Sequence, residues 1–413
     1  MRGEILFLAH RVPFPPDRGD KIRSHHLLKA LAGIAPVHVG CLGETDDDMA
    51  QSDELAAIGA SHFLSRRRKH VVAAGFAALA TRRPVSLAAF DHAGLREWVV
   101  RTIAERPIGA VFVFSGQMGQ YVPDDFEGRV VIDLCDVDSA KFEAYGAQGG
   151  GPRGWIDRRE ARLLAAEEER LAHRAHCTLL VSEAEAGLFR SRLRDPGGTR
   201  IAALRNGIDT ARFDPQAVAP HPDLAPQGGP HLVFTGQMDY APNVAAVLRV
   251  AERLLPAIRR VHPEAVFHVV GRAPVAQLRK LDGQDGIRVW GEVPDVRPFL
   301  ASADLVLAPL EIARGIQNKV LEAMAMARAV VLSPEAATGI DARDGAHFTV
   351  GADDAALVER ALDLLANAPS ALTMGAAARR YVMDHQGWQA MLAPLARIVG
   401  GDAPVAQDRR NAA

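Results

Sequence analysis

The chain has 413 residues, which is too long for one ordinary domain and predicts two. Apolar residues make up 48% and charged residues 24% of the sequence, so each domain is expected to bury a large core. The formal net charge of −2 lacks the basic excess of a nucleic-acid-binding protein, and we expect no nucleic-acid partner.

The cysteines Cys41, Cys135 and Cys177 are odd in number, lie far apart and form no CxxC pair. This spacing argues against a disulfide framework and a thiolate zinc site, and it suits a reducing compartment. The apolar stretch near the N-terminus is too short for a signal peptide, and no apolar run reaches about 18 residues. We therefore expect a cytoplasmic protein without a membrane span.

Short apolar runs alternate with longer helical patterns in the first half of the chain. The runs lie at residues 4–10, 37–42, 109–115, 129–134 and 176–182. Helical patterns follow at residues 21–33 and 158–175, among others. Near-continuous apolar strands that alternate with helices predict a parallel sheet covered on both faces.

Residues 221–230, HPDLAPQGGP, are rich in Pro and Gly and predict a loop or linker. The alternation then restarts, with apolar runs at 231–236, 265–271, 286–292, 304–309 and 329–333. We therefore predict an α/β fold of two doubly wound, Rossmann-like domains that face a central cleft. Ligands of such sheets bind beyond the carboxyl ends of the strands.

The predicted domain bounds follow from these patterns. The first domain is expected over residues 1–215 and the second over 228–383. One amphipathic helix over 384–400 is expected to cross back to the first domain, and residues 401–413 are expected to be disordered.

Residues 313–325, ARGIQNKVLEAMA, place Arg314 and Lys319 at a helix start, where cations are unfavourable unless an anion lies between them. Gly315 gives a tight turn, and the backbone of Ile316, Gln317 and Asn318 then offers free N–H groups to such an anion.

Glu322 lies one turn beyond Asn318 on the same helix face, where its carboxylate could accept hydrogen bonds from a cis-diol such as ribose. The alternative is that Lys319 and Glu322 form a plain surface ion pair three residues apart.

This stretch resembles the donor-site motif of retaining, family-4-like glycosyltransferases with the GT-B fold, in which two Glu residues flank seven others. Glu322 matches the second Glu, which in the family holds the nucleotide ribose. Arg314 stands where the family has its first Glu, which contacts the donor sugar. The resemblance therefore leaves the sugar open, and Arg314 is expected to hold the diphosphate instead.

Residues 234–274 resemble the first strand–helix–strand of the family's donor domain, and Gly236 at the end of that first strand is expected in the nucleotide site. The family's diphosphate-binding Arg and Lys fall near Gln237 and Asn243, and neither is cationic. The positive charge is then expected from Arg272, Arg314 and Lys319.

Two further segments match the family. Residues 291–296 resemble the loop whose backbone meets the nucleobase, which places Val293 there. Residues 205–215 resemble the segment that leads out of the first domain, although a turn followed by an Asp that caps a helix explains them better.

The combination of residues 10–23, 132–142, 313–325 and 338–341 resembles the sugar transferases associated with bacterial exosortase (PEP-CTERM) and exopolysaccharide gene clusters. The resemblance covers essentially the whole chain. It implies transfer of a sugar from a nucleotide-diphosphate sugar to a glycan or lipid-linked acceptor, with retention at the anomeric carbon and without a metal.

In the first half, Gly19 ends a Pro-rich loop and would let the backbone come close to a phosphate. Lys21 and Arg23 repeat the pattern of cations at a helix start, and solvated surface charges explain them equally well.

Asp136 and Asp138 form a DxD, which in GT-A glycosyltransferases holds a divalent metal. Two Rossmann halves argue against GT-A, so either carboxylate is expected to orient the acceptor hydroxyl or act as a base. Asp138 could equally cap a helix that starts near Ser139. The histidines show no ligand spacing, and we expect no metal site.

The basic run SRRRKH at residues 65–70 precedes an apolar helix framed by arginines. That pattern suits peripheral docking on an anionic membrane, where a lipid-linked acceptor would lie, although a buried helix with solvated ends is slightly favoured.

Three other functions stay open. A GT-B sugar-nucleotide epimerase would need no acceptor, and a degenerate site would bind nucleotide without turnover. A dehydrogenase is least supported, because no GxGxxG follows a strand.

Overall fold

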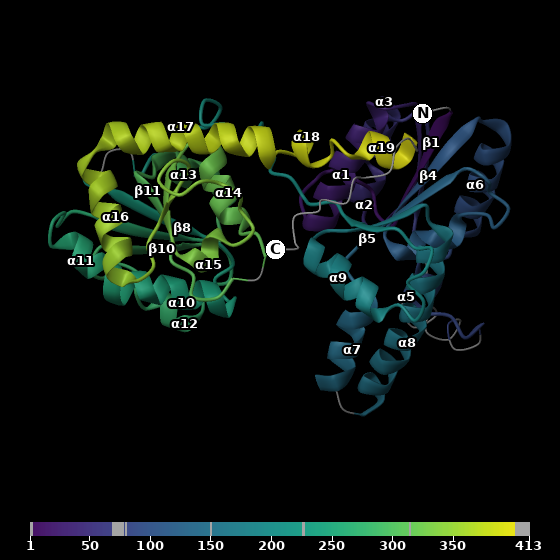
Figure 1. Cartoon of the computed structure of the whole chain (residues 1–413), viewed down its shortest axis with the longest axis horizontal. Coiled ribbons are helices and arrows are strands. Elements are labelled where there is room, and N and C mark those ends of the chain that lie inside the picture. Colours follow the sequence, from purple (N-terminus) through teal and green to yellow (C-terminus); the bar gives the residue numbers. More distant parts are fainter. Residues whose placement is uncertain are drawn as a thin grey trace. The chain divides into compact units, whose positions relative to one another are not determined.

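The computed structural model describes residues 3–67, 78, 81–148, 151–224, 228–313 and 315–400. The chain packs as two compact units (Figure 1). Unit 1 runs from the N-terminus to Asn206 and takes up the chain again at Leu392, and unit 2 is Gly207–Met391. The predicted tail, 401–413, lies outside the described residues.

Unit 1 is built on a parallel sheet of seven strands in the order β3-β2-β1-β4-β5-β6-β7. The strands are β1 (Glu4–Ala9), β2 (Val37–Gly43), β3 (Ser61–Arg66), β4 (Ile108–Phe114), β5 (Arg129–Cys135), β6 (Cys177–Leu180) and β7 (Ile201–Ala203). Every residue of β2 is buried, as expected for a strand covered on both faces. The strand order reverses between β1 and β4, which is the topological switch point of this sheet.

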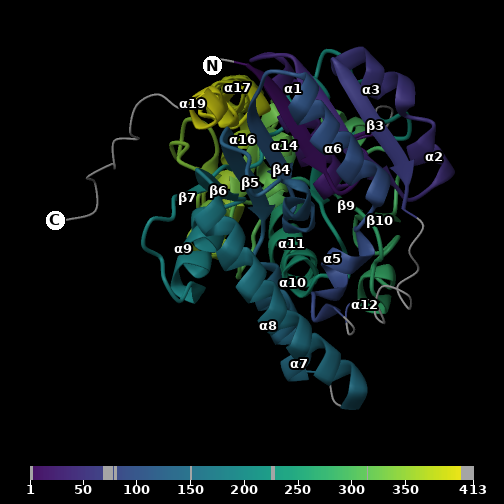
Figure 2. The same cartoon turned by 90° about the vertical axis from the view of Figure 1, so that its right-hand side faces the viewer.

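Helices cover the sheet of unit 1. They are α1 (Gly19–Ala32), α2 (Asp46–Met49), α3 (Ser52–Ile58), α5 (Val85–Ala89), α6 (Ala93–Glu105), the 3-10 turn η1 (Gly116–Tyr121), α7 (Asp138–Gln148), α8 (Gly151–Arg174), α9 (Glu183–Arg192) and α19 (Leu395–Gly400). Helices α7 and α8 pack against each other and project together from the unit (Figure 2). Helix α19 contacts α1, β4 and β5, so the returning chain becomes part of unit 1.

Unit 2 repeats the plan with six parallel strands in the order β10-β9-β8-β11-β12-β13. They are β8 (His231–Thr235), β9 (Val266–Val270), β10 (Ile287–Gly291), β11 (Leu305–Ala308), β12 (Ala329–Leu332) and β13 (Thr349–Val350). The switch point lies between β8 and β11.

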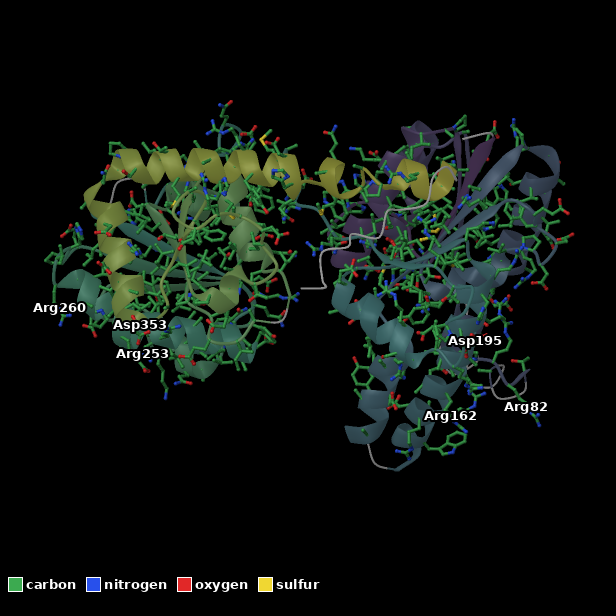
Figure 3. The ribbon with its side chains drawn as sticks, viewed as in Figure 1. Arg82, Arg162, Asp195, Arg253, Arg260 and Asp353 are labelled. Carbon is green, nitrogen blue, oxygen red and sulfur yellow. The ribbon has the colours of Figure 1, made fainter. Side chains whose placement is uncertain are left out.

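The helical segments of unit 2 are α10 (Ala241–Arg249), the π-helical turn η2 (Val250–Leu254), α11 (Leu255–Arg259), α12 (Ala276–Arg279), α13 (Arg297–Ser302), α14 (Asn318–Ala325), α15 (Pro334–Ala337), α16 (Asp354–Ala366), α17 (Ala368–His385) and α18 (Trp388–Met391). Helix α14 packs against α17, and both contact β12. Charged side chains such as Arg253, Arg260 and Asp353 point outward from the unit (Figure 3). No helix among the described residues is long and apolar enough to cross a membrane.

The predicted fold class is confirmed, because each apolar run predicted as a strand forms one, in two parallel sheets with Rossmann-like order. Three strands, β3, β7 and β13, were not predicted from the sequence. Strand β3, SHFLSR, lies at the sheet edge with all its residues only partly buried, so it lacks the apolar signature of the inner strands. Strands β7 and β13 have three and two residues, too few to show a pattern.

The single helix expected over 384–400 was wrong, because that segment holds the end of α17, then α18, then α19. Between α17 and α18 the backbone pairs instead with the chain entering unit 2. Ile208 donates its N–H to the Gln386 carbonyl at 2.8 Å, and Trp388 donates to the Ile208 carbonyl at 3.3 Å. Pro394, which has no N–H, then precedes α19.

Gly207 is required at this pairing, since a Cβ there would lie 2.4 Å from the Trp388 backbone nitrogen. The two passages of the chain between the units therefore run side by side within unit 2. Asp209 accepts a hydrogen bond from the Arg212 N–H at 2.9 Å and caps a turn here, whereas its sequence indicated the cap of a helix.

The interior of unit 2 holds a pair of buried histidines at the amino-terminal side of its sheet. The Trp290 indole can only donate, and its Nε1 lies 3.1 Å from His268 Nδ1. His268 therefore carries its proton on Nε2, which faces His231 Nδ1 at 3.0 Å. Burial, followed by the nearby His231 and Arg288, lowers the pKa of His268 to about 3.

We expect this pair to make unit 2 sensitive to acid. The folded pKa of His268 lies below its unfolded value, so its contribution to stability is complete above about pH 6.5 and is lost as the pH falls toward 3. Chemical denaturation should show a loss on the order of 2–4 kcal/mol from this residue across that window. In His268→Gln the free energy of unfolding should depend less on pH across the same window. An unchanged pH dependence would contradict the assignment.

Candidate functional site

The carboxyl edge of the sheet in unit 2 gathers several of the predicted donor-site residues. Lys319, in the first turn of α14, donates a hydrogen bond to Asn243 Oδ1 and lies with its Nζ 4.7 Å from the centre of the Phe234 ring. Asn243 in turn donates to the Gln237 carbonyl at 2.9 Å. Gln237 accepts at its side-chain oxygen from Arg272 at 2.9 Å. Strands β8 and β9 and helices α10 and α14 thus bring these residues into one cluster, which we call the cationic cluster.

The cations of this cluster have neutral hydrogen-bond partners. Lys319 is partnered by the Asn243 amide and Arg272 by the Gln237 amide. Burial lowers the pKa of Lys319 to about 8, while the nearby Glu322 raises it. A desolvated ammonium whose partner is neutral is a favourable place for an anion to bind.

Two glycines bring the loops of the cluster together. A Cβ at Gly271 would lie 1.6 Å from the Gly236 carbonyl oxygen, so no other residue fits there. A Cβ at Gly236 would lie 2.8 Å from Asn243 Nδ2 and 3.5 Å from Lys319 Nζ. Gly236 therefore lies directly against the cluster.

The start of α14 has the shape expected of an anion site. Gly315 has a φ of 72°, which a glycine adopts readily. Gln317 is extended, and no side chain caps the helix that begins at Asn318. Ile316 lies against the turn at Gly339. Arg314 lies outside the residues that the structure describes.

Glu322 follows Lys319 on α14 and is only partly exposed. Burial raises the pKa of its carboxyl, and the positive charges of Arg212 and Lys319 oppose that rise. Arg212 was not predicted as a site residue, because the turn that carries it is far from α14 in the sequence. Val293 is partly buried against the core of unit 2, and no described contact links it to the cationic cluster.

In unit 1, a pocket of about 380 Å³ lies at the switch point of the sheet. Residues that follow β1, β4 and β5 line it, including His10, Ser115 and Asp136. Asp138 also lines it, so the structure brings the two predicted carboxylates into the same pocket. His10 directly follows the strand EILFLA. A residue at the carboxyl end of a parallel strand is a candidate for ligand binding, but His10 was not predicted as a site residue.

Asp136 and Asp138 both pair with Lys141, at 2.9 and 3.2 Å. Helix α7 begins at Asp138, which lies in its first turn. The N–H of Ser139 is bound instead by Glu168 at 3.0 Å. Burial raises the pKa of the Glu168 carboxyl to about 7. No group of three or more His, Cys, Asp or Glu side chains that could hold a metal occurs in the described parts of the chain.

Gly19 is exposed at the start of α1, and a Cβ there would meet nothing within 4 Å. Because the space beside it is open, packing does not require a glycine at this position. Lys21 and Arg23, by contrast, are buried and paired inside the unit. Lys21 lies 2.7 Å from Asp48, and Arg23 lies 2.8 Å from Asp133, so neither is a solvated surface charge.

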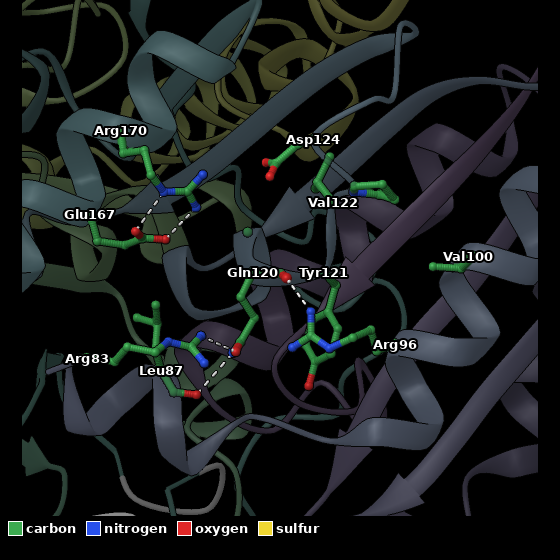
Figure 4. Close-up of a pocket in the computed structure, with 12 residues that line it drawn as sticks. Arg83, Leu87, Arg96, Val100, Gln120, Tyr121, Val122, Asp124, Glu167 and Arg170 are labelled. Atoms are coloured by element: carbon green, nitrogen blue, oxygen red, sulfur yellow. Dashed lines mark hydrogen bonds and ion pairs between the residues drawn. The ribbon is translucent and has the colours of Figure 1, made fainter. Parts of the chain in front are cut away.

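A larger pocket of unit 1, of about 540 Å³, lies away from the strand ends among η1, α5, α6 and α8 (Figure 4). Its arginines are held by their own neighbours. Arg170 makes two hydrogen bonds to Glu167, at 2.7 and 2.8 Å, and Arg83 donates to Gln120 at 2.8 Å. None of the predicted site residues lines it.

The basic run at 65–70 is described only as far as Arg67. Arg66 pairs with Asp46, and Arg67 pairs with Glu44 at 2.9 Å and lies over the Phe90 ring. The apolar helix predicted after it falls mostly outside the described residues.

Comparison with known proteins finds a family match in part of unit 2. Residues 229–367 match the model of the family described as Glycosyl transferases group 1. Glycogen synthases from two strains of Mycobacterium tuberculosis are 27% identical to this chain over 128 residues. That match covers 31% of this chain and 28% of the length of each synthase.

Solved structures are similar over nearly the whole chain. Sucrose-phosphate synthase from Thermosynechococcus elongatus matches with a TM-score of 0.57 and 16% identity, covering 96% of this chain and 98% of that one. HepE of Anabaena in complex with UDP-glucose matches with a TM-score of 0.57 and 14% identity, covering 97% and 100%. WaaG, a glycosyltransferase involved in lipopolysaccharide biosynthesis, matches with a TM-score of 0.55 and 18% identity, covering 96% and 100%.

These likenesses show the GT-B fold. The exosortase-associated subfamily stays a prediction.

The lowered pKa of Lys319 provides a test of whether the cationic cluster binds a diphosphate. Because an anion binds the protonated ammonium, the affinity for UDP should fall as the pH rises through about 8. Lys319→Gln should weaken UDP binding roughly tenfold or more and remove that pH dependence. Titration calorimetry at several pH values measures both effects.

Lys280→Gln is the matched control, since Lys280 is an exposed lysine of the same unit. UDP affinity that is flat across this pH range and unchanged in Lys319→Gln would show that the cluster binds no diphosphate.

Proposed function

We propose that the protein is a glycosyltransferase that moves a sugar from a nucleotide-diphosphate sugar to a glycan or lipid-linked acceptor. The observation that carries this proposal is the cationic cluster, in which Lys319 and Arg272 hydrogen-bond to neutral amides. It lies at the carboxyl edge of the sheet, in the part of the chain that matches the glycosyltransferase family. HepE of Anabaena, a neighbour in fold, has been solved with UDP-glucose, which supports a nucleotide sugar as the donor.

The cluster would act on the leaving group. Breaking the bond to the sugar leaves negative charge on the diphosphate, and charges placed there in advance stabilise the transition state. Lys319 and Arg272 supply that charge, together with the N–H groups at the start of α14 and with Arg314. Glu322 would accept hydrogen bonds from the ribose hydroxyls. Because these groups stabilise the diphosphate, the proposed reaction uses no metal.

The acceptor would be held by unit 1. Asp136 and Asp138 line its pocket and are proposed to orient the acceptor hydroxyl. The resemblance favours retention at the anomeric carbon, with the departing phosphate taking the hydroxyl proton. It also suggests exopolysaccharide synthesis in the cytoplasm, at the inner face of the membrane.

One observation favours a second candidate, a protein that binds nucleotide without turnover. Arg314 stands where the related enzymes have a Glu that contacts the donor sugar. An epimerase of the same fold is distinguished by its product, since it would release a free sugar or an epimer without an acceptor.

The test is calorimetric binding of UDP, GDP and ADP, each with and without EDTA, to the wild type and to Glu322→Gln. We expect one nucleotide to bind, to keep its affinity in EDTA, and to bind roughly five- to thirtyfold more weakly to the variant, because the ribose loses a charged acceptor. Glu359→Gln, an exposed glutamate of α16, is the matched control and should bind as the wild type does.

Binding that disappears in EDTA and ignores Glu322 would contradict the proposal and point to a metal held by Asp136 and Asp138. Binding with no turnover of any nucleotide sugar would favour the second candidate.

A further inference from the structure

His10 lines the pocket at the switch point of unit 1. It is the first residue after β1, and it is 9% exposed. Its ring is fixed between two aromatic side chains, stacked on Phe114 at 5.8 Å and edge-on to Phe90 at 5.6 Å between ring centres. The plane of the imidazole is therefore set by packing on two sides.

The two nitrogens of this ring have different surroundings. Nε2 lies 3.2 Å from Arg11 and 3.4 Å from Asp20, so it is engaged by the loop that precedes α1. Nδ1 is buried and has no hydrogen-bond partner among the described residues. A buried polar atom without a partner costs stability unless a ligand or water satisfies it.

The surroundings of His10 favour its neutral form. Burial lowers its pKa most strongly, and Arg11 adds to that effect, while Asp20 and Glu44 oppose it. Other charged side chains that line the pocket are paired: Lys141 with Asp136 and Asp138, and Arg18 with Asp20. A neutral imidazole has one donor and one acceptor nitrogen, so Nδ1 offers either an N–H or a lone pair.

A hydroxyl group suits Nδ1 in both tautomers, because a hydroxyl both donates and accepts. A fully ionised phosphate only accepts, and it also needs positive charge that is not already neutralised.

The pocket has no such spare charge among its described lining residues. Its cations are Arg11, Arg18 and Lys141, and its carboxylates are Asp20, Asp136 and Asp138. Arg11 lies 2.7 Å and Arg18 lies 3.3 Å from Asp20, and Lys141 lies 2.9 Å from Asp136. Glu44 gives the two arginines a further acidic partner. This balance differs from the cationic cluster of unit 2, where the partners are neutral amides.

We propose that this pocket binds an uncharged sugar ring of the acceptor, with one ring hydroxyl on His10 Nδ1 and others on the paired charges around it. The pocket's volume of about 380 Å³ lies in the range of small-ligand sites, and Phe90 and Phe114 are among its lining residues. The inference rests on the proposed function, and it names the acceptor class. The sugar is added to a hydroxyl of an existing glycan and not to the phosphate of a lipid carrier.

The experiment is NMR of the histidine ring nitrogens in ¹⁵N-labelled full-length protein. The probes are methyl glycosides of glucose, galactose and mannose, against inorganic phosphate and geranyl phosphate. The His10 resonances are identified by their loss in His10→Asn. We expect at least one glycoside to shift the His10 Nδ1 resonance with saturation, and neither phosphate to do so.

Variants separate a direct contact from a structural effect. His10→Phe keeps a flat ring without Nδ1 and should bind the glycoside roughly tenfold more weakly, because one hydrogen bond is lost. His10→Asn keeps a polar group near the position of Nδ1 and should recover part of that affinity. Arg170→Gln, in the other pocket of unit 1, should bind the glycoside as the wild type does.

The inference is overturned if a phosphate shifts the His10 resonances and no glycoside does, if no probe shifts them, or if His10→Phe binds glycosides normally. UDP, GDP and ADP added to the same samples separate this result from the proposed function. Nucleotide binding without glycoside binding removes only this inference. Glycoside binding without any nucleotide binding leaves a sugar site and removes the proposed glycosyltransferase.

Discussion

The geometry of a parallel sheet is the constraint on which both candidate sites depend. Each crossover helix brings the chain back to the end of the sheet where the previous strand began. All strands therefore run in the same direction, and their carboxyl ends meet at one edge. In unit 1 that edge carries His10, Ser115 and Asp136 after three different strands. In unit 2 it carries Gln237 and Arg272 after β8 and β9, with Lys319 on the helix that follows β11. Residues separated by more than a hundred positions thus meet without any local signal between them.

The two edges differ in how their charges are compensated. In unit 1 each cation of the pocket has a carboxylate partner, which makes a polar but balanced wall. In unit 2 the partners of Lys319 and Arg272 are the amides of Asn243 and Gln237. An amide orients a cation through a hydrogen bond but leaves its charge available. Gln237 and Asn243 fall where the family that the sequence resembles has cations. These amides need not weaken an anion site, because Arg272 and Lys319, which they hold, keep their charge available.

Packing of the backbone supports these side chains. The close approach at Gly271 and Gly236 sets the loop that carries Gln237, and the approach at Gly207 pairs the two passages of the chain within unit 2. In unit 1 the buried pair of Arg23 and Asp133 joins α1 to β5, so the helix after the Pro-rich loop is fixed to the strand beneath the pocket. These contacts are internal to each unit and do not compete with a ligand.

The sequence by itself determined the fold class, because strands buried on both faces must be apolar along their length, and that pattern survives in one dimension. It also indicated Lys319, Glu322 and Gly236, whose neighbours in sequence form a recognisable motif. It missed β3, whose residues at a sheet edge are mixed in character, and it joined three helices into one across Gly387 and Pro394. Only the tertiary structure decided which charges are compensated. Lys21 and Arg23 proved to be buried in ion pairs with Asp48 and Asp133, and His10 proved to have an unpartnered nitrogen in a pocket. The partner of a charge is set by the packing of strands distant in sequence, and no local pattern records it.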